Sequence, residues 1–187
     1  MNYNDLVIAH RSKELEFDKT YLELILPIKD SWVELDAVID FVRRWNRRVP
    51  IGKNKDKIKR AVLRLKPKFQ QLKKCSLDDF DFSEKNVALI KEIFHELSET
   101  ALKSTGTTKL LHGLNRDLFV MWDKGICEQY GCYQNENGYI LFLRMMQDKA
   151  RELIKEKTKA EVEKELGRTL AKLIDEYNWM NFRTSKK

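Results

Sequence analysis

The stretch from residue 105 to residue 128 combines side chains that could do chemistry. It reads TGTTKLLHGLNRDLFVMWDKGICE, with Lys109 just after Gly106 and Asp123 fourteen residues beyond the lysine. A lysine amine is a nucleophile once it is deprotonated, and a carboxylate can stabilise positive charge that develops beside it. If both side chains face one cavity, the pair indicates covalent catalysis.

The small residues before Lys109 predict the beginning of a helix. Gly106, Thr107 and Thr108 are typical of a helix start, where free backbone N–H groups can bind an anion. We therefore assign these three residues to phosphate binding. A lysine in the first turn opposes the helix dipole, which favours a functional Lys109 with a negative partner at the same helix end.

Asp123 admits two interpretations. It follows the apolar run LFVMW and precedes a short helix expected to end near Tyr130 and Gly131. Aspartate is a preferred helix N-cap, and a capping role explains the residue without any catalysis. A catalytic carboxylate at this position is the alternative.

The order of these features resembles the helix-hairpin-helix DNA glycosylases of the endonuclease III type. The resemblance covers about residues 100–135 and includes Ile126 behind the aspartate. It implies that Gly106 is the hairpin glycine that grips DNA phosphate, that Lys109 attacks the sugar and that Asp123 assists. Such an enzyme must extrude a base, and Trp45, Trp122 and Tyr133 are candidates for an aromatic pocket, with a role in the core as the alternative.

Basic residues are concentrated in residues 43–74. This segment holds fourteen lysines and arginines against the single acid Asp56, a local charge of +13 in a chain of net charge +7, so the remainder carries −6. Such segregation is typical of a surface that contacts a polyanion, although a merely solvated helix face also fits. The residues that we assign to nucleic-acid binding here are Arg47, Arg48, Lys53, Lys55, Lys59 and Arg64.

Apolar residues recur at helical spacing along most of the chain, which predicts an all-α fold. We expect a compact orthogonal bundle of several helices that forms one domain over residues 1–187, with two possible lobes at residues 1–75 and 76–187. Expected helices include 32–48, 54–72 with a kink or break at Pro67, 107–115, and one final helix from 158 to 177 that begins with a Thr158–Glu161 capping box. The stretch YLELILPI is ambiguous, and we favour a helix.

Several function classes are excluded or disfavoured. No apolar run approaches the ~20 residues of a membrane span, and early charges break any signal-peptide pattern, so we expect a cytoplasmic protein with no membrane partner. Cys75, Cys127 and Cys132 form no C-x-x-C pair and read as reduced thiols. We expect no metal and no cofactor, because dinucleotide and phosphate-loop glycine patterns are missing and the family's iron–sulfur cysteines have no counterpart near the C-terminus.

Two functions are compatible with these features. The first is a DNA-directed glycosylase or lyase that uses Lys109 and Asp123 on a damaged or modified base. The alternative is a non-catalytic basic helical module that binds nucleic acid or an acidic protein through residues 43–74. A third interpretation, in which the basic face serves only solubility, stays open.

Overall fold

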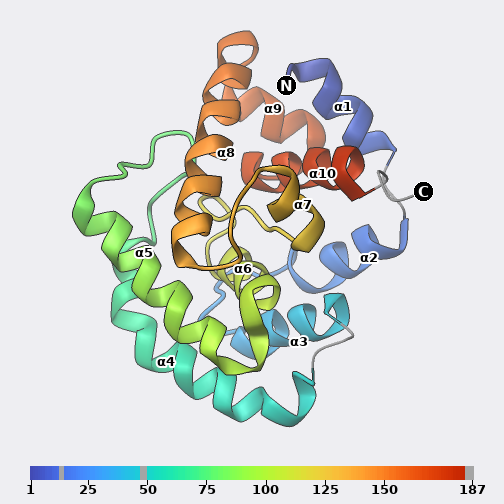
Figure 1. Ribbon diagram of the computed structural model, residues 1–187. Helices are drawn as coiled ribbons and strands as arrows, with labels where there is room; N and C mark the ends of the chain where they lie inside the picture. The colour runs from blue at the N-terminus through green and yellow to red at the C-terminus, as the bar shows by residue number, and fades with distance from the viewer. Residues whose placement is uncertain (13–14, 47–49, 184–187) are drawn as a thin grey trace.

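The computed structural model describes residues 1–12, 15–46 and 50–183, and every regular element in these ranges is helical, which confirms the all-α prediction (Figure 1). A short 3-10 turn, Gly52–Asn54, precedes α4, and a π-helical turn, Ser98–Leu102, joins α5 to α6. The helices are α1 (Tyr3–Arg11), α2 (Leu15–Leu24), α3 (Leu35–Trp45), α4 (Lys55–Gln71), α5 (Glu84–Leu97), α6 (Lys103–Leu114), α7 (Lys124–Gln129), α8 (Glu136–Glu156), α9 (Lys159–Leu166) and α10 (Leu170–Arg183).

The helices surround α6, which runs through the middle of the bundle (Figure 1). Helices α4 and α5 lie side by side along one edge, and α8 packs against α5 and α10. At the opposite end α1 packs on α10, so elements from both ends of the chain share one hydrophobic core. The core therefore continues across residue 75, the point where the sequence suggests a boundary between lobes.

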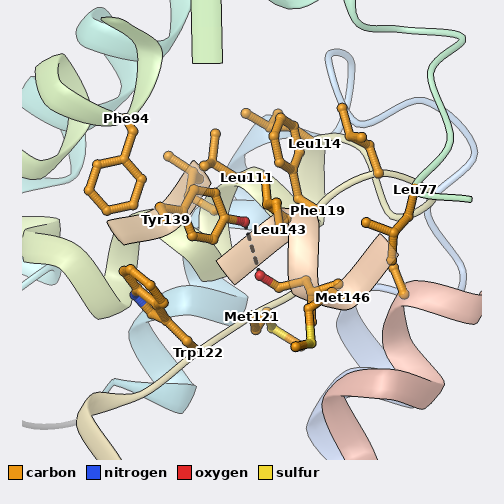
Figure 2. Packing of buried hydrophobic residues seen from close by; sticks show 14 of the residues in the cluster. Leu77, Phe94, Leu111, Leu114, Phe119, Met121, Trp122, Tyr139, Leu143 and Met146 are labelled. Atoms are coloured by element: carbon orange, nitrogen blue, oxygen red, sulfur yellow. Dashed lines mark hydrogen bonds between the residues drawn. The ribbon is translucent and has the colours of Figure 1, made fainter. Parts of the chain in front are cut away.

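Aromatic side chains fill the centre of this core. Trp122 and Tyr139 are buried with ring centroids 5.1 Å apart, and Phe94 lies 5.0 Å from Tyr139 (Figure 2). The Tyr139 hydroxyl donates a hydrogen bond of 2.9 Å to the carbonyl of Val120, so this buried polar group is satisfied. Trp122 is 1% exposed, which gives it the role in the core rather than in an open aromatic pocket.

Local sequence signals locate some helix ends correctly. The capping box at Thr158 and Glu161 is present, and α2 confirms the helical interpretation of YLELILPI as far as Leu24. Gly131 ends the turn after α7 with a φ of 64°, a left-handed conformation that glycine adopts without strain.

Other local predictions are wrong. A break at Pro67, one of the two expected outcomes, is wrong, because helix α4 continues through this residue. Pro67 lies on the exposed face, where water can satisfy the carbonyl that has no proline N–H to bind. The expected final helix is two helices, because Gly167 takes a φ of 63° between α9 and α10.

Candidate functional site

The helix that carries Lys109 begins earlier than the sequence indicates. The chain turns at Thr100 and Lys103, the latter with a φ of 51°, and α6 is helical from Lys103 to Leu114. Gly106 is thus inside the helix and not in a hairpin turn, so the predicted helix start near Thr107 is wrong. Lys109 accordingly lies in the middle of α6.

The small residues around Gly106 serve close packing. A Cβ on Gly106 would lie 3.2 Å from the Asn46 side chain, and Thr107 and Thr108 are fully buried. Thr108 Oγ1 accepts a hydrogen bond from the Trp122 backbone N–H at 3.3 Å, which ties α6 to the segment just before Asp123. The backbone at these positions is part of a buried helix, so the reason for assigning Gly106, Thr107 and Thr108 to phosphate binding is removed.

The Lys109 side chain extends to the end of α3. Its amine donates a 3.3 Å hydrogen bond to the carbonyl of Trp45 and lies 5.8 Å from the centroid of the Trp45 ring. The residue is partly buried, so its amine is neither in bulk water nor sealed in the core. Trp45 is also partly buried and packs beside Phe41, with centroids 4.7 Å apart. The Lys109 amine thus lies beside the partly buried ring of Trp45, which packs against Phe41.

Asp123 caps α7 as the ordinary interpretation predicts. Its Oδ1 accepts a 2.9 Å hydrogen bond from the Ile126 N–H, and its backbone is extended, as at a helix N-cap. The residue remains partly exposed. A cap does not exclude a second role, because one carboxylate oxygen can bind the helix start while the other faces outward.

A cluster of buried charges on α10 lies next to Lys109, and sequence analysis did not single it out. Lys172 is 4% exposed and forms ion pairs with Asp175 at 2.9 Å and with Glu176 at 3.4 Å. Glu176 also pairs with His10 of α1 at 2.7 Å. We call Lys172, Asp175, Glu176 and His10 the α10 charge cluster.

The electrostatics connect this cluster to Lys109. Burial alone would lower the pKa of Lys172, but the carboxylates of Asp175 and Glu176 outweigh it and raise this pKa above the ordinary value. Burial raises the pKa of Asp175, against the opposing effect of Lys172 and, more weakly, of Lys109. The Lys172 amine lies 5.2 Å from the Trp45 ring centroid, so Lys109 and Lys172 approach the same indole.

A neutral hydrogen-bonded chain begins at Tyr21, whose ring centroid lies 6.3 Å from that of Trp45, beside Lys172. The Lys172 amine is 5.0 Å from the Tyr21 ring, and the Tyr21 hydroxyl is 3.0 Å from His112 Nε2. His112 Nδ1 lies 2.7 Å from the carbonyl of Phe119, which only accepts, so Nδ1 carries the proton and Nε2 accepts from Tyr21. Burial lowers the pKa of His112 to about 3 and raises the pKa of Tyr21 to about 12, so both are neutral near pH 7.

Acidic residues from neighbouring helices neutralise much of the basic segment. Lys55 and Lys59 both pair with Asp36 of α3, at 3.3 Å and 2.7 Å, and Arg64 pairs with Glu96 of α5 at 2.5 Å. The pKa of Asp36 is lowered, chiefly by its hydrogen bond with Lys59. These three residues, predicted to bind nucleic acid, already have carboxylate partners. Because those carboxylates come from α3 and α5, the net positive charge on this surface is smaller than the sequence of residues 43–74 indicates.

The remaining residues predicted to bind nucleic acid have different settings. Lys53 is exposed in the turn before α4 and forms no ion pair within the described residues. Arg47 and Arg48 lie outside those residues. Tyr133, the third aromatic candidate, is 81% exposed in the loop before α8.

The described part of the chain shows neither a metal centre nor a membrane span. No three histidine, cysteine, aspartate or glutamate side chains in it gather as metal ligands would. In the same ranges, no helix combines the length and the apolar character that crossing a bilayer requires.

Comparison with protein-family models, with curated proteins and with solved structures finds no match to this chain.

Proposed function

We propose that this protein acts on nucleic acid through the amine of Lys109, as a glycosylase or lyase that forms an imine with a deoxyribose. The observation that carries the proposal is the approach of Lys109 and Lys172 to the same Trp45 ring. The carboxylates of Asp175 and Glu176 keep Lys172 protonated. A fixed ammonium group nearby favours the neutral amine of a second lysine, which is the form that attacks carbon. The proposal requires this effect to outweigh that of the Asp175 carboxylate, which interacts with Lys109 and favours its charged form.

The surroundings of Lys109 suit this chemistry in two further respects. Partial burial limits hydration of the amine, and the Trp45 indole offers a flat surface against which an extruded sugar or base can pack. The Asp175 carboxylate is near enough to interact with Lys109, and Asp123 is tied to α6 through the hydrogen bond between Thr108 and Trp122. Either carboxylate could stabilise a developing cation on the sugar.

The covalent step balances for an abasic site in its open aldehyde form. The neutral Lys109 amine adds to the C1′ carbon, the carbonyl oxygen leaves as water after taking up two protons, and a C=N bond replaces the C=O bond. Borohydride then delivers hydride to the iminium carbon and leaves a stable C–N bond between lysine and sugar.

Borohydride trapping tests the proposal. We expect wild-type protein to form a covalent adduct with an oligonucleotide that carries one abasic site, and peptide mapping by mass spectrometry to locate it on Lys109. Lys109→Gln should abolish the adduct. Lys155→Gln, which removes an exposed lysine near the end of α8, is the matched control and should retain it.

Asp123→Asn separates capping from catalysis, because asparagine caps helices as well as aspartate does. Retained trapping with this variant would show that imine formation needs Asp123 only as a cap. Equal adduct formation by Lys109→Gln, or no adduct with the wild-type protein, would refute the lysine chemistry and favour the non-catalytic binding module.

A further inference from the structure

A half-open hollow of about 190 Å³ lies on the surface between the loop after α2 and the end of α6. Its wall includes the indole of Trp32 and the charged side chains of Lys29, Lys73 and Arg116. The volume is below the ~300 Å³ at which pockets for drug-sized ligands begin, and it suits a group about as large as one heterocycle. The lining has both an aromatic surface and cationic side chains.

Hydrogen bonds between distant parts of the chain hold the walls of the hollow in place. Ser31 Oγ donates to the carbonyl of Leu114 at 3.1 Å, and Arg116 donates to the carbonyl of Ile25 at 2.8 Å and to that of Ile28 at 3.1 Å. Because these hydrogen bonds join the α2 loop to the end of α6, the hollow is formed without a ligand.

Trp32 is anchored on one side and accessible on the other. Its ring meets the buried Phe69 edge to face, with centroids 5.4 Å apart, and the amine of Lys66 lies 5.5 Å from its centroid. The side chain remains partly exposed and lines the hollow. An indole held in this manner gives up little conformational freedom when another ring stacks on it.

The cations around Trp32 differ from Lys55 and Lys59 of α4 in having no carboxylate partner within the described ranges, a property that they share with Lys57 and Arg60 of α4. Lys29, Lys66 and Lys73 are exposed, and none forms an ion pair with a carboxylate of the described residues, whereas Lys55 and Lys59 do. Lys66 and Lys73 of the basic segment, together with Lys29, therefore place positive charge that no described carboxylate pairs with beside an aromatic hollow.

One carboxylate at the hollow is already engaged. Asp30 Oδ1 accepts a 2.8 Å hydrogen bond from the Trp32 backbone N–H, which is the main cause of the lowered pKa of Asp30. Lys73 and Lys66 add to this lowering, which places both cations near the same loop. Asp117 also lines the hollow, so a bound phosphate must lie beside the cations and away from the two carboxylates.

We propose that this hollow binds one nucleotide of a single-stranded nucleic acid, with the base against Trp32 and the flanking phosphates beside Lys29, Lys66 and Lys73. The site rests on the proposed nucleic-acid partner and is independent of the chemistry at Lys109. A single strand is required because a base in a duplex is covered on both faces by its neighbours, whereas an unpaired base can stack on an aromatic side chain.

Fluorescence anisotropy with a labelled oligothymidylate of about eight nucleotides tests the site, since that length is in the range that single-strand sites cover. We expect Trp32→Ala to weaken binding about tenfold, within the range for the loss of one stacked base. Leu141→Ala removes an exposed apolar side chain of α8, away from the hollow, and should leave the affinity unchanged. A blunt duplex of the same length should bind more weakly than the single strand.

The lysines provide a variant that does not disturb the core. Lys29→Gln combined with Lys73→Gln removes two exposed charges and should lower the slope of log affinity against log salt by about 0.7 for each phosphate that is no longer neutralised. Lys155→Gln should leave that slope unchanged. Thermal unfolding of each variant checks that Trp32→Ala remains folded.

The outcomes separate this site from the proposed chemistry. The hollow is not a binding site if Trp32→Ala is folded and both it and the double lysine variant bind the oligothymidylate as tightly as the wild type. A preference for duplex over single strand would also overturn the proposal. Lys109→Gln should still bind the oligothymidylate, so failure of abasic trapping with intact dependence on Trp32 refutes only the lysine chemistry. If the abasic oligonucleotide is still trapped on Lys109 but Trp32→Ala does not weaken oligothymidylate binding, only the hollow is refuted.

Discussion

The α10 charge cluster and the surface pairs of α4 are built from the same chemical groups and differ in their exposure to water. Lys172 is 4% exposed and pairs with two buried carboxylates, whereas Lys59 pairs with Asp36 on the surface, where the two side chains are 38% and 55% exposed. A buried charge without a partner is costly, and an exposed pair contributes little, because water and salt screen it. We therefore expect the loss of one partner to cost more stability in the α10 charge cluster than in the surface ion pairs of α4.

Lys172→Met should give the largest difference between the two kinds of ion pair. It leaves Asp175 and Glu176 buried without their shared cation, and we expect the free energy of unfolding to fall by about 3–5 kcal/mol. Urea denaturation measures this decrease, with Lys59→Met as the matched surface control at about 1 kcal/mol or less. A decrease for Lys172→Met no larger than that of the control would show that water reaches the cluster and solvates its carboxylates.

His112 differs from both kinds of ion pair, because it is buried and neutral. Its pKa is about 3 in the folded protein and about 6.5 when the chain is unfolded, so between these values only the unfolded state binds the proton. Stability must then fall as the pH falls from about 6.5 toward 3, by up to ~1.4 kcal/mol per pH unit.

The measurement is the pH dependence of the free energy of unfolding over that window. His112→Phe should remove this contribution to the slope, whatever it does to stability at pH 7. His95→Gln is the matched control, because the His95 side chain is 61% exposed and its replacement should leave the slope unchanged. An unaltered slope in His112→Phe would contradict the assignment of a buried neutral imidazole.

Helix content was predictable, because apolar periodicity and caps are local properties of the sequence. The stripe of Ile58, Val62, Leu65 and Phe69 in α4 needs only its own spacing to be recognised, and all four side chains are buried. Of the two interpretations of Asp123, the structure confirms the cap, which is likewise a local property, and the catalytic role stays a prediction.

The environment of α6 was not predictable from local signals. Gly106 looks like a turn residue in sequence, yet it lies inside α6. A Cβ on Gly113 of the same helix would lie only 2.5 Å from a Val38 methyl group, so the helix uses glycine for close packing against α3. That requirement arises from a segment about seventy residues away. A local sequence pattern cannot distinguish a glycine that permits a turn from a glycine that lets another helix pack closely.

The α10 charge cluster was missed for a related reason. Lys172, Asp175 and Glu176 have the i, i+3 and i+4 spacing of ordinary surface pairs, and nothing in the segment itself says that they are buried. Their partners His10, Tyr21 and Trp45 come from the first quarter of the chain. A usable signal was their position in LAKLIDEY, where apolar residues on both sides leave the charges little polar face to share.

Asp36 gives the smallest expected effect and tests what the surface pairs are for. Asp36→Asn removes the carboxylate shared by Lys55 and Lys59, and we expect it to change the free energy of unfolding by less than about 1 kcal/mol. Lys59 loses its carboxylate partner in this variant, whereas Lys55 keeps Asp40 at 3.4 Å. If the surface of α4 nevertheless binds phosphate, freeing Lys59 should tighten binding of the oligothymidylate and steepen its salt dependence by about 0.7 for each additional phosphate that is neutralised.

Anisotropy at several salt concentrations measures both quantities, and Glu156→Gln on α8 provides the same charge change away from α4. An increase shared by both variants would reflect net charge alone. No increase with Asp36→Asn would place Lys59 outside the binding surface, and would limit nucleic-acid binding by the basic segment to cations without carboxylate partners, such as those beside Trp32. Asp36 and Asp40 of α3 then neutralise part of the basic segment, and the cations that pair with no described carboxylate, among them Lys66 and Lys73 beside Trp32, are where a polyanion binds.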